Sequence, residues 1–440
     1  MPIPESLKTL LKIAAAALAT ALVVVGATLL GLDPPHSDDD LLPIKRNVDP
    51  SQNPFPKLKR LHLYKGPNDS TEDLDRARKM TSGDEEWDET FVQRLLNRNS
   101  KAIRSFEKAT HLAEWQDTFE PTIEADFDYA SNWIDIAKLL RVRSMLNLRN
   151  GSREEAISDA ITSMKFGSLL LAAEGGLIHQ LTAITTAAIG QHAVLNIFKH
   201  SNLIDTELAF LCDELDSISY SSRKFADSFR VEHQIFRSGV DAYNSGKFHL
   251  EDLLPSDENS SRLPPKNILL FKPNRTLKRH AAAMRQLTED SQKARHLSTR
   301  EISKELDANS EKHWKIWISG NAYGEILLLI SLIHYDDILD RFALTLVSHD
   351  MIRTRAAIER YRLKHESLPE SLDALVPGFI DSIPLDQFSG GNIQYLPHTK
   401  VIYSWGINFS DDGGEFDGKQ LNSKSDDFVI KIDLPSPAPE

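Results

Sequence analysis

Apolar side chains recur every three or four positions over most of residues 82–366, and this spacing predicts a mainly helical domain. One stretch of the pattern covers residues 133–150, and a second covers residues 152–173. Between them, Gly151 fits the residue that follows a helix end, and Ser152 fits the N-cap of the next helix. The two stretches therefore predict a helical hairpin.

Further helices are expected from the same spacing at residues 175–198, at 225–243, from near Arg275, at 324–333 and up to His365. The stretch 175–198 is apolar around its whole circumference, which is typical of a helix buried in a core. The stretch 324–333 is too short to cross a bilayer, so we also assign it to the core. Residues 246–266 carry prolines and a run of polar residues, which predicts a long loop.

The pattern changes in residues 367–440, where short apolar runs alternate with proline, glycine and acidic residues. A short helix is expected from about residue 368 to about residue 376. Strands are expected at residues 393–396, 401–405 and 427–432. The predicted fold class is therefore mainly α, with a small antiparallel β-module at the C-terminus.

The first apolar segment, residues 13–32, contains twenty residues and no charge. Because about twenty apolar residues span a bilayer core as a helix, the segment predicts a transmembrane anchor over residues 1–32. Lys8 and Lys12 precede it and four aspartates follow it, which places the N-terminus in the cytoplasm and the bulk of the chain outside. The alternative is a cleaved signal peptide, which gives a secreted protein and leaves the same bulk outside the cytoplasm.

Residues 33–81 are rich in proline and aspartate, and we expect them to form a spacer between the anchor and the helical domain. The formal net charge of the chain is −13, which argues against a nucleic-acid partner because phosphate contacts need a basic face. The single cysteine, Cys212, excludes a disulfide within the chain and a zinc cluster built on several thiolates.

Several short motifs follow one another near the C-terminus: Ala357 with Tyr361, Leu368-Pro369, Pro384 with Asp386, Tyr403-Ser404 with Gly406, Asp411 to Gly414, and Asp427. In this order they resemble the C-terminal half of the G-type major pseudopilins of type II secretion systems, in which a loop rich in glycine and aspartate binds calcium. Over most of its length the chain also resembles uncharacterised, membrane-anchored helical proteins of planctomycete-type bacteria. The chain begins Met1-Pro-Ile-Pro-Glu-Ser, without a prepilin leader, so the resemblance implies the fold of the module and its ion site.

Six oxygen-bearing residues make this acidic loop the candidate metal site: Asn408, Asp411, Asp412, Asp417, Asp426 and Asp427. Calcium takes about six to eight oxygen ligands, mainly from carboxylates and carbonyls. Glycines in the loop would let the backbone turn around an ion. Together with the resemblance, this composition predicts a calcium site, and the alternative interpretation is a solvated acidic turn.

The sequence contains no motif for nucleotide binding, for a serine nucleophile or for a zinc-binding histidine pair, so no catalytic residue is assigned. His179, His192 and His200 could be read as a metal cluster. Their spacing does not place ligands one helical turn apart, so we expect core or surface histidines instead. The arginines between residues 353 and 362 predict a solvated basic helix face or contact with an acidic partner.

These observations lead to one expected function and two alternatives. We expect a non-enzymatic, single-pass protein of a bacterial inner membrane, whose extracytoplasmic helical domain is a scaffold or binds a protein partner. The first alternative is an accessory component of a type II secretion or pilus-like machine. The second is an extracytoplasmic hydrolase whose site in the helical domain lacks a recognisable motif.

Overall fold

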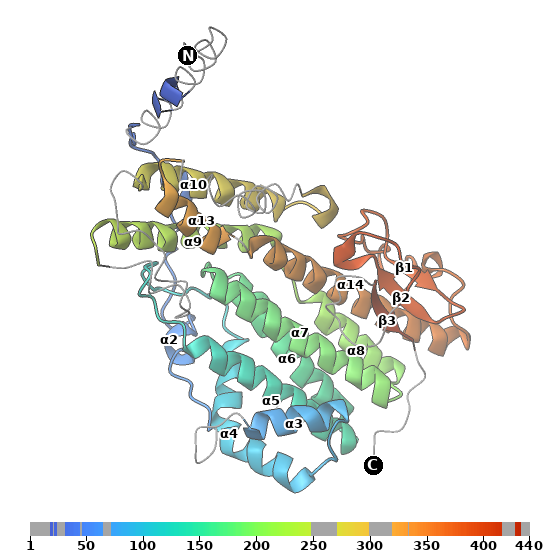
Figure 1. The fold of residues 1–440 in the computed structure, drawn as a ribbon. Helices are drawn as coiled ribbons and strands as arrows, with labels where there is room; N and C mark the ends of the chain where they lie inside the picture. The colour runs from blue at the N-terminus through green and yellow to red at the C-terminus, as the bar shows by residue number, and fades with distance from the viewer. Residues whose placement is uncertain are drawn as a thin grey trace, which may run out of the picture.

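The structure of the chain is a computed structural model, and it describes residues 18–20, 22–23, 31–44, 46–64, 72–247, 271–298, 319–332, 334–415 and 427–432. Its helices form two layers (Figure 1). The lower layer in this view contains α3 (Glu72–Ser82), α4 (Glu89–Ala109), α5 (Tyr129–Arg149), α6 (Arg153–Leu171), α7 (Leu177–His200) and α8 (Asp205–Asp216). The upper layer contains α9 (Ser222–Asn244), α10 (Pro273–Asp290) and α13 (Ala322–Leu332).

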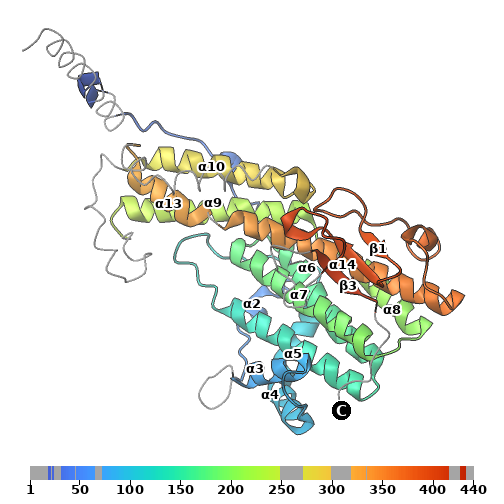
Figure 2. The ribbon, with the colours of Figure 1, turned by 45° about the vertical axis from the view of Figure 1, so that its right-hand side comes forward.

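One long helix, α14 (Tyr335–His365), runs from the upper layer to a small sheet (Figure 2). The sheet has the order β1 (Gln394–Leu396), β2 (Val401–Ser404), β3 (Phe428–Lys431), and both strand pairs are antiparallel. The predicted fold class, mainly helical with a small C-terminal antiparallel sheet, is therefore confirmed for the described residues.

The predicted hairpin is confirmed as α5 and α6, which are joined at Gly151. This glycine has a φ of +80°, in the left-handed region where a side chain would be strained. Ser152 stands at the N-cap of α6, although its side chain makes no capping hydrogen bond. Toward the C-terminus, the short helix expected after residue 368 is a single 3-10 turn, η6 (Leu372–Leu375).

Two glycines bring α6 and α7 together backbone against backbone. A Cβ atom added at Gly167 of α6 would lie 2.5 Å from the carbonyl oxygen of Ala183 on α7. In the same way, a Cβ at Gly190 of α7 would lie 2.6 Å from the carbonyl oxygen of Ala160 on α6. Because these distances leave no room for a methyl group, the two glycines set the spacing between the helices.

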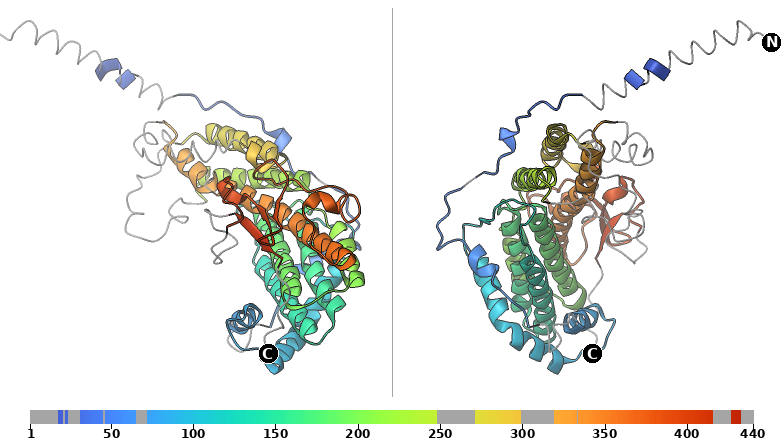
Figure 3. Two further views of the ribbon diagram at one scale, coloured as in Figure 1. Left: turned by 90° about the vertical axis from the view of Figure 1, so that its right-hand side faces the viewer. Right: turned by 60° about the vertical axis from the view of Figure 1, so that its left-hand side comes forward.

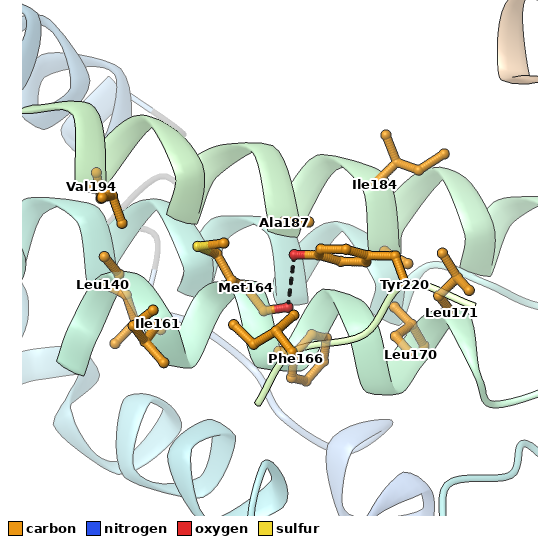
Figure 4. Close-up of a cluster of buried hydrophobic side chains, with 14 of the residues drawn as sticks. Leu140, Ile161, Met164, Phe166, Leu170, Leu171, Ile184, Ala187, Val194 and Tyr220 are labelled. Atoms are coloured by element: carbon orange, nitrogen blue, oxygen red, sulfur yellow. Dashed lines mark hydrogen bonds between the residues drawn. The ribbon is translucent and has the colours of Figure 1, made fainter. Parts of the chain in front are cut away.

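A continuous apolar core surrounds this helix pair (Figure 4). Phe166 of α6 stacks on Phe106 of α4, with ring centroids 3.7 Å apart. The Tyr220 ring is also buried there, and its hydroxyl donates to the carbonyl oxygen of Met164 at 3.4 Å. Each large side chain buried in such a core contributes about 1.5–3 kcal/mol to folding.

Among the described helices, α7 is long and apolar enough to cross a bilayer by length and composition. The protein buries 61% of its most apolar window, as expected of the core helix that the sequence predicts. The predicted transmembrane helix at residues 13–32 lies mostly outside the described residues. Of that segment the structure describes residues 18–20 and 22–23, which are helical, and residues 31–32.

The basic run of α14 binds acidic residues of the chain itself. Arg355, expected on a solvated face, is only 2% exposed and donates to Glu359 one turn along the helix at 2.5 Å. Arg353 donates from Nε to Asp216, the last residue of α8, at 2.7 Å. The Arg353–Asp216 contact joins α14 to α8, whereas the pair of Arg355 lies within α14 itself.

We predict that replacing Gly190 by alanine lowers the free energy of unfolding by about 1–3 kcal/mol, since the added methyl forces α6 and α7 apart. Denaturant unfolding of the two proteins measures the difference. Gly239 of α9 is the matched control, because a Cβ there would meet only the Ile123 side chain, at 3.3 Å. Gly239→Ala should be neutral or stabilising, and an equal loss in both variants would contradict the close approach of α6 and α7.

Candidate functional site

The chain that follows the apolar segment is fixed to the upper helix layer. We call residues 31–44 the N-terminal segment, and it runs down the side of that layer toward the lower one (Figure 3). The carboxylate of Asp33 accepts hydrogen bonds from the backbone N–H groups of Asn274 at 2.9 Å and of Arg275 at 2.8 Å. Both groups belong to the first turn of α10, where free N–H groups and the helix dipole favour an anion.

Residues 33–44 and 46–64, which fall in the expected spacer, continue along the helices. The Arg46 guanidinium pairs with Glu174 at 3.0 Å. The short helix α2 (Phe55–Leu58) also lies against the lower layer, since Phe55 is 1% exposed and Trp133 of α5 donates to the carbonyl oxygen of Leu58 at 3.1 Å.

Asp38 of the N-terminal segment enters between α9 and α10 and begins a chain of polar contacts. Its carboxylate binds His233 and Arg237, both on α9. His233 Nδ1 lies 2.9 Å from Nδ1 of His280 on α10, and His280 Nε2 lies 3.1 Å from the hydroxyl of Ser331 on α13. These five residues form one cluster, which we call the Asp38 network.

The charges of the Asp38 network follow from burial and hydrogen bonding. Burial raises the pKa of Asp38, but hydrogen bonds from Arg237 and His233 outweigh it and hold the pKa at about 2. Burial lowers the pKa of His233 and lowers that of His280 to well below its ordinary value. At neutral pH the network therefore contains an ionised aspartate and two neutral imidazoles.

With both imidazoles neutral, one set of tautomers satisfies every contact. His233 donates its Nε2–H to Asp38 and accepts at Nδ1 from the Nδ1–H of His280. His280 Nε2 then accepts from the hydroxyl of Ser331. The network thus links the N-terminal segment to α9, α10 and α13 without an unpaired imidazole nitrogen.

An acid, imidazoles and a hydroxyl in series are also the groups that nucleophilic catalysis uses. Here both His233 and His280 are 0% exposed, and the ring of Phe236 stacks on His280 with centroids 3.9 Å apart. A substrate has no access to either imidazole in this arrangement. The Asp38 network therefore has a structural role, in which it holds the N-terminal segment against α9, α10 and α13.

A second buried cluster fastens α2 and the following loop to the lower layer. Asp117 binds Lys59 at 2.5 Å, the hydroxyl of Tyr129 at 2.8 Å and Nε2 of His179 at 3.1 Å. Burial raises the pKa of Asp117, but hydrogen bonds from His179 and Lys59 outweigh it and lower the pKa. His179 is 0% exposed, so it is a core histidine held by an internal carboxylate.

The structure brings together four of the six residues predicted to bind calcium. Asp427 accepts hydrogen bonds from the backbone N–H groups of Asp412 at 3.1 Å and of Gly414 at 2.7 Å. Asn408 donates to the Asp412 carboxylate at 2.6 Å, and Tyr403 donates to Asp411 at 3.3 Å. The remaining two residues of the prediction, Asp417 and Asp426, lie outside the described residues.

The carboxylates of this loop influence one another. Burial raises the pKa of Asp427, and the negative charges of Asp412 and Asp411 raise it further. Their oxygens accept hydrogen bonds from the loop itself. In the part of the chain that the structure describes, no group of three histidine, cysteine, aspartate or glutamate side chains is arranged to hold a metal ion.

Among the cavities that open on the described helices, two are lined by histidines considered as metal ligands in the sequence. One of about 480 Å³ lies where α5 and α7 end, and Trp87, Arg149 and His200 line it together with residues 84–86. A second, of about 280 Å³, lies between α5, α7, α14 and β3, and its lining includes Arg141 and His192. His192 and His200 thus line separate cavities, and His179 lies in the core. The position of Arg141 in a cavity could not be predicted from the sequence, because charged residues on amphipathic helices usually face solvent.

Comparison of the chain with protein-family models, with curated proteins and with solved structures gives no match. The functional argument therefore depends on the geometry of these clusters and cavities.

We predict that Asp38→Ala releases the N-terminal segment, because it leaves His233 and Arg237 without their anion. Backbone amides of residues 31–44 should exchange with deuterium faster, and the free energy of unfolding should fall by about 1–3 kcal/mol, the range for hydrogen bonds to charged groups. Exchange followed by mass spectrometry measures the first effect. Asp39→Ala removes a neighbouring exposed carboxylate and is the control; unchanged exchange in Asp38→Ala would show that the network does not hold the segment.

Proposed function

We propose that this chain is a membrane-anchored extracytoplasmic protein that holds a protein partner close to the membrane and carries out no catalysis itself. The observation that carries the proposal is the position of the first contacts after the apolar segment. Lys272 donates to the carbonyl oxygen of Gly31 at 2.8 Å, and Asp33 accepts from the first turn of α10. No free linker separates residue 32 from the folded body.

If residues 13–32 cross the bilayer, this arrangement restricts how the helical body can move relative to the membrane. The helical body would start at the membrane surface, with the N-terminus of α10 nearest to the lipid. The contacts of Asp38 and of Asp40, which pairs with Arg285 at 2.7 Å, would limit rotation of the body about its anchor. A partner bound to the lower layer would then be held at a defined distance from the membrane.

The buried polar clusters support a structural body in preference to a hydrolase. The acid and imidazole groups around Asp38 and Asp117 bind one another and the surrounding chain, and their histidines are covered by aromatic rings. A component of a secretion or pilus-like machine is one class of partner that this proposal includes.

We also propose that the acidic loop of the C-terminal module binds calcium. The support is that Asp411 and Asp412 lie near Asp427, whose pKa is raised by burial and further by their two negative charges, and a divalent cation would offset those charges. The carboxylates and the glycines at positions 413 and 414, both with positive φ, give the loop suitable donors and a tight turn.

The proposed membrane topology predicts where the full chain is found in cells. A reporter that is active only outside the cytoplasm, fused after Glu440, should be active, and the chain should remain in the membrane fraction after an alkaline wash. Replacing Val23 and Val25 by arginine costs about 2.5–3.5 kcal/mol for each charge at the centre of a spanning helix, so the chain should leave that fraction. Replacing both by leucine is the control. An intact chain found in the cytosol would rule out the anchor.

Calcium should stabilise the full chain. In a calorimetric titration we expect binding heat and, at a calcium concentration one hundred times Kd, a stabilisation of about 2.7 kcal/mol. Asp427→Asn should abolish both effects. Asp381→Asn, which changes an exposed carboxylate of the same module, should leave them unchanged. Neither heat nor a shift of the melting temperature at millimolar calcium would discard this site without affecting the anchoring proposal.

A further inference from the structure

The cavity between α5, α7, α14 and β3 has apolar walls and basic groups. Its volume is about 280 Å³, close to the lower end of the range of about 300–1,000 Å³ that is usual for small-molecule sites. Ile184, Ile189 and Leu344 contribute to the apolar wall, and Phe428 of β3 lies beside them. Arg141, His192 and Arg341 contribute the basic groups.

Arg141 is the most unusual of these side chains. Its Nε is buried and, among the described residues, has no hydrogen-bond partner. Burial lowers the pKa of the guanidinium, and the positive charge of Arg78 lowers it further. A guanidinium that is partly removed from water, with a buried Nε that has no partner, is unfavourable because its desolvation is not fully offset.

His192 of α7 lines the same cavity and is influenced by the charge of Arg141. Burial lowers its pKa to about 4, and the positive charge of Arg141 contributes to the shift. The described residues that line this cavity include no aspartate and no glutamate. The cavity therefore attracts negative charge, and it offers an apolar surface next to that charge.

We propose that this cavity binds an anionic amphiphile, a molecule with one carboxylate or phosphate group on an apolar chain. The anionic group is recognised by Arg141, whose planar fork matches either headgroup, with Arg341 adding charge at the exposed side. The hydroxyl of Ser348, which also lines the cavity, is a further donor. The chain lies on Ile184, Ile189 and Leu344.

The two halves of the lining exclude simpler ligands. A small anion such as acetate would satisfy Arg141 and leave the isoleucine wall in contact with water. An uncharged alcohol would cover the wall and leave Nε of Arg141 unpaired. An amine would be repelled by the guanidinium groups of Arg141 and Arg341, while His192, with a pKa of about 4, is neutral. Only a ligand with both parts satisfies the whole site.

The test uses the full-length chain in nanodiscs of zwitterionic lipid, with protein-free nanodiscs as the blank. Calorimetry compares octanoate and octyl phosphate with octanol, acetate and octylamine. We expect one or both of the first two to bind at least tenfold more tightly than the other three, and the tighter of the two identifies the headgroup. Binding of octanol as tight as that of octanoate, or no binding of either anion, would overturn the proposal.

Substitutions assign the binding to this cavity. Arg141→Met should weaken the anion about tenfold to a hundredfold, which corresponds to a loss of about 1.5–3 kcal/mol for hydrogen bonds to a charged group. Arg104→Met, which changes an exposed arginine of α4, is the matched control and should bind like the parent chain. Equal weakening in both variants would contradict the assignment.

A spectroscopic readout separates binding in the cavity from a general effect on folding. A bound anion next to His192 stabilises the imidazolium, so the pKa of His192 should rise from about 4 when the anion is added. Titration of the His192 ring protons by NMR measures this shift, and a His192→Gln variant assigns the signal. A pKa of His192 that does not change at saturating anion would place the ligand elsewhere.

Discussion

The close approach of α6 and α7 is the constraint on which the rest of this structure depends. Gly167 and Gly190 allow the carbonyl oxygens of one helix to lie against the backbone of the other. This contact fixes the position of α7 at the centre of the fold. The helices α5, α9 and α14 all pack against α7. The cavity between α5 and α14 is also lined by α7, so its shape depends on the same contact. A helix pair at ordinary spacing would displace each of these elements.

Polar groups buried around that core determine how the two layers are connected. The Asp38 network spans three helices of the upper layer, and the Asp117 cluster joins the segment around α2 to α5 and α7. Buried ion pairs add little net stability compared with apolar packing, but removal of one partner leaves an uncompensated charge. Their effect is therefore selective: they favour the one arrangement of the N-terminal segment in which every charge is paired. Arg141 differs from these two clusters, because its buried Nε has no hydrogen-bond partner among the described residues.

Local signals in the sequence were sufficient for much of the fold and for little of the site. The turn at Gly151, the helices on either side of it and the three C-terminal strands depend on residues close in sequence, so spacing and turn chemistry predicted them. The partners of Asp38 lie about two hundred positions away, and no local pattern reveals such a pairing; the aspartates after residue 32 were interpreted only as a charge flank. The burial of Arg355 was missed for the same reason, because the helix period gives no information about Phe198 of α7, whose ring lies beside the guanidinium. Four of the six residues predicted for the acidic loop lie close together, and the role of the loop as a calcium site is still a prediction.

The long separation between Asp33 and α10 also constrains the order in which the protein can mature. The partners of Asp33 are 241 and 242 positions further along the chain, so these bonds cannot form until synthesis has passed α10. Closure of such a large loop is entropically costly and is compensated only when the helices it joins are already packed. If the leading apolar residues enter a bilayer as they are made, insertion precedes the fastening of the body by more than two hundred residues of translation. During that interval the N-terminal segment is not yet bound to α10. A chaperone or protease can therefore reach parts of the chain that are covered in the folded protein.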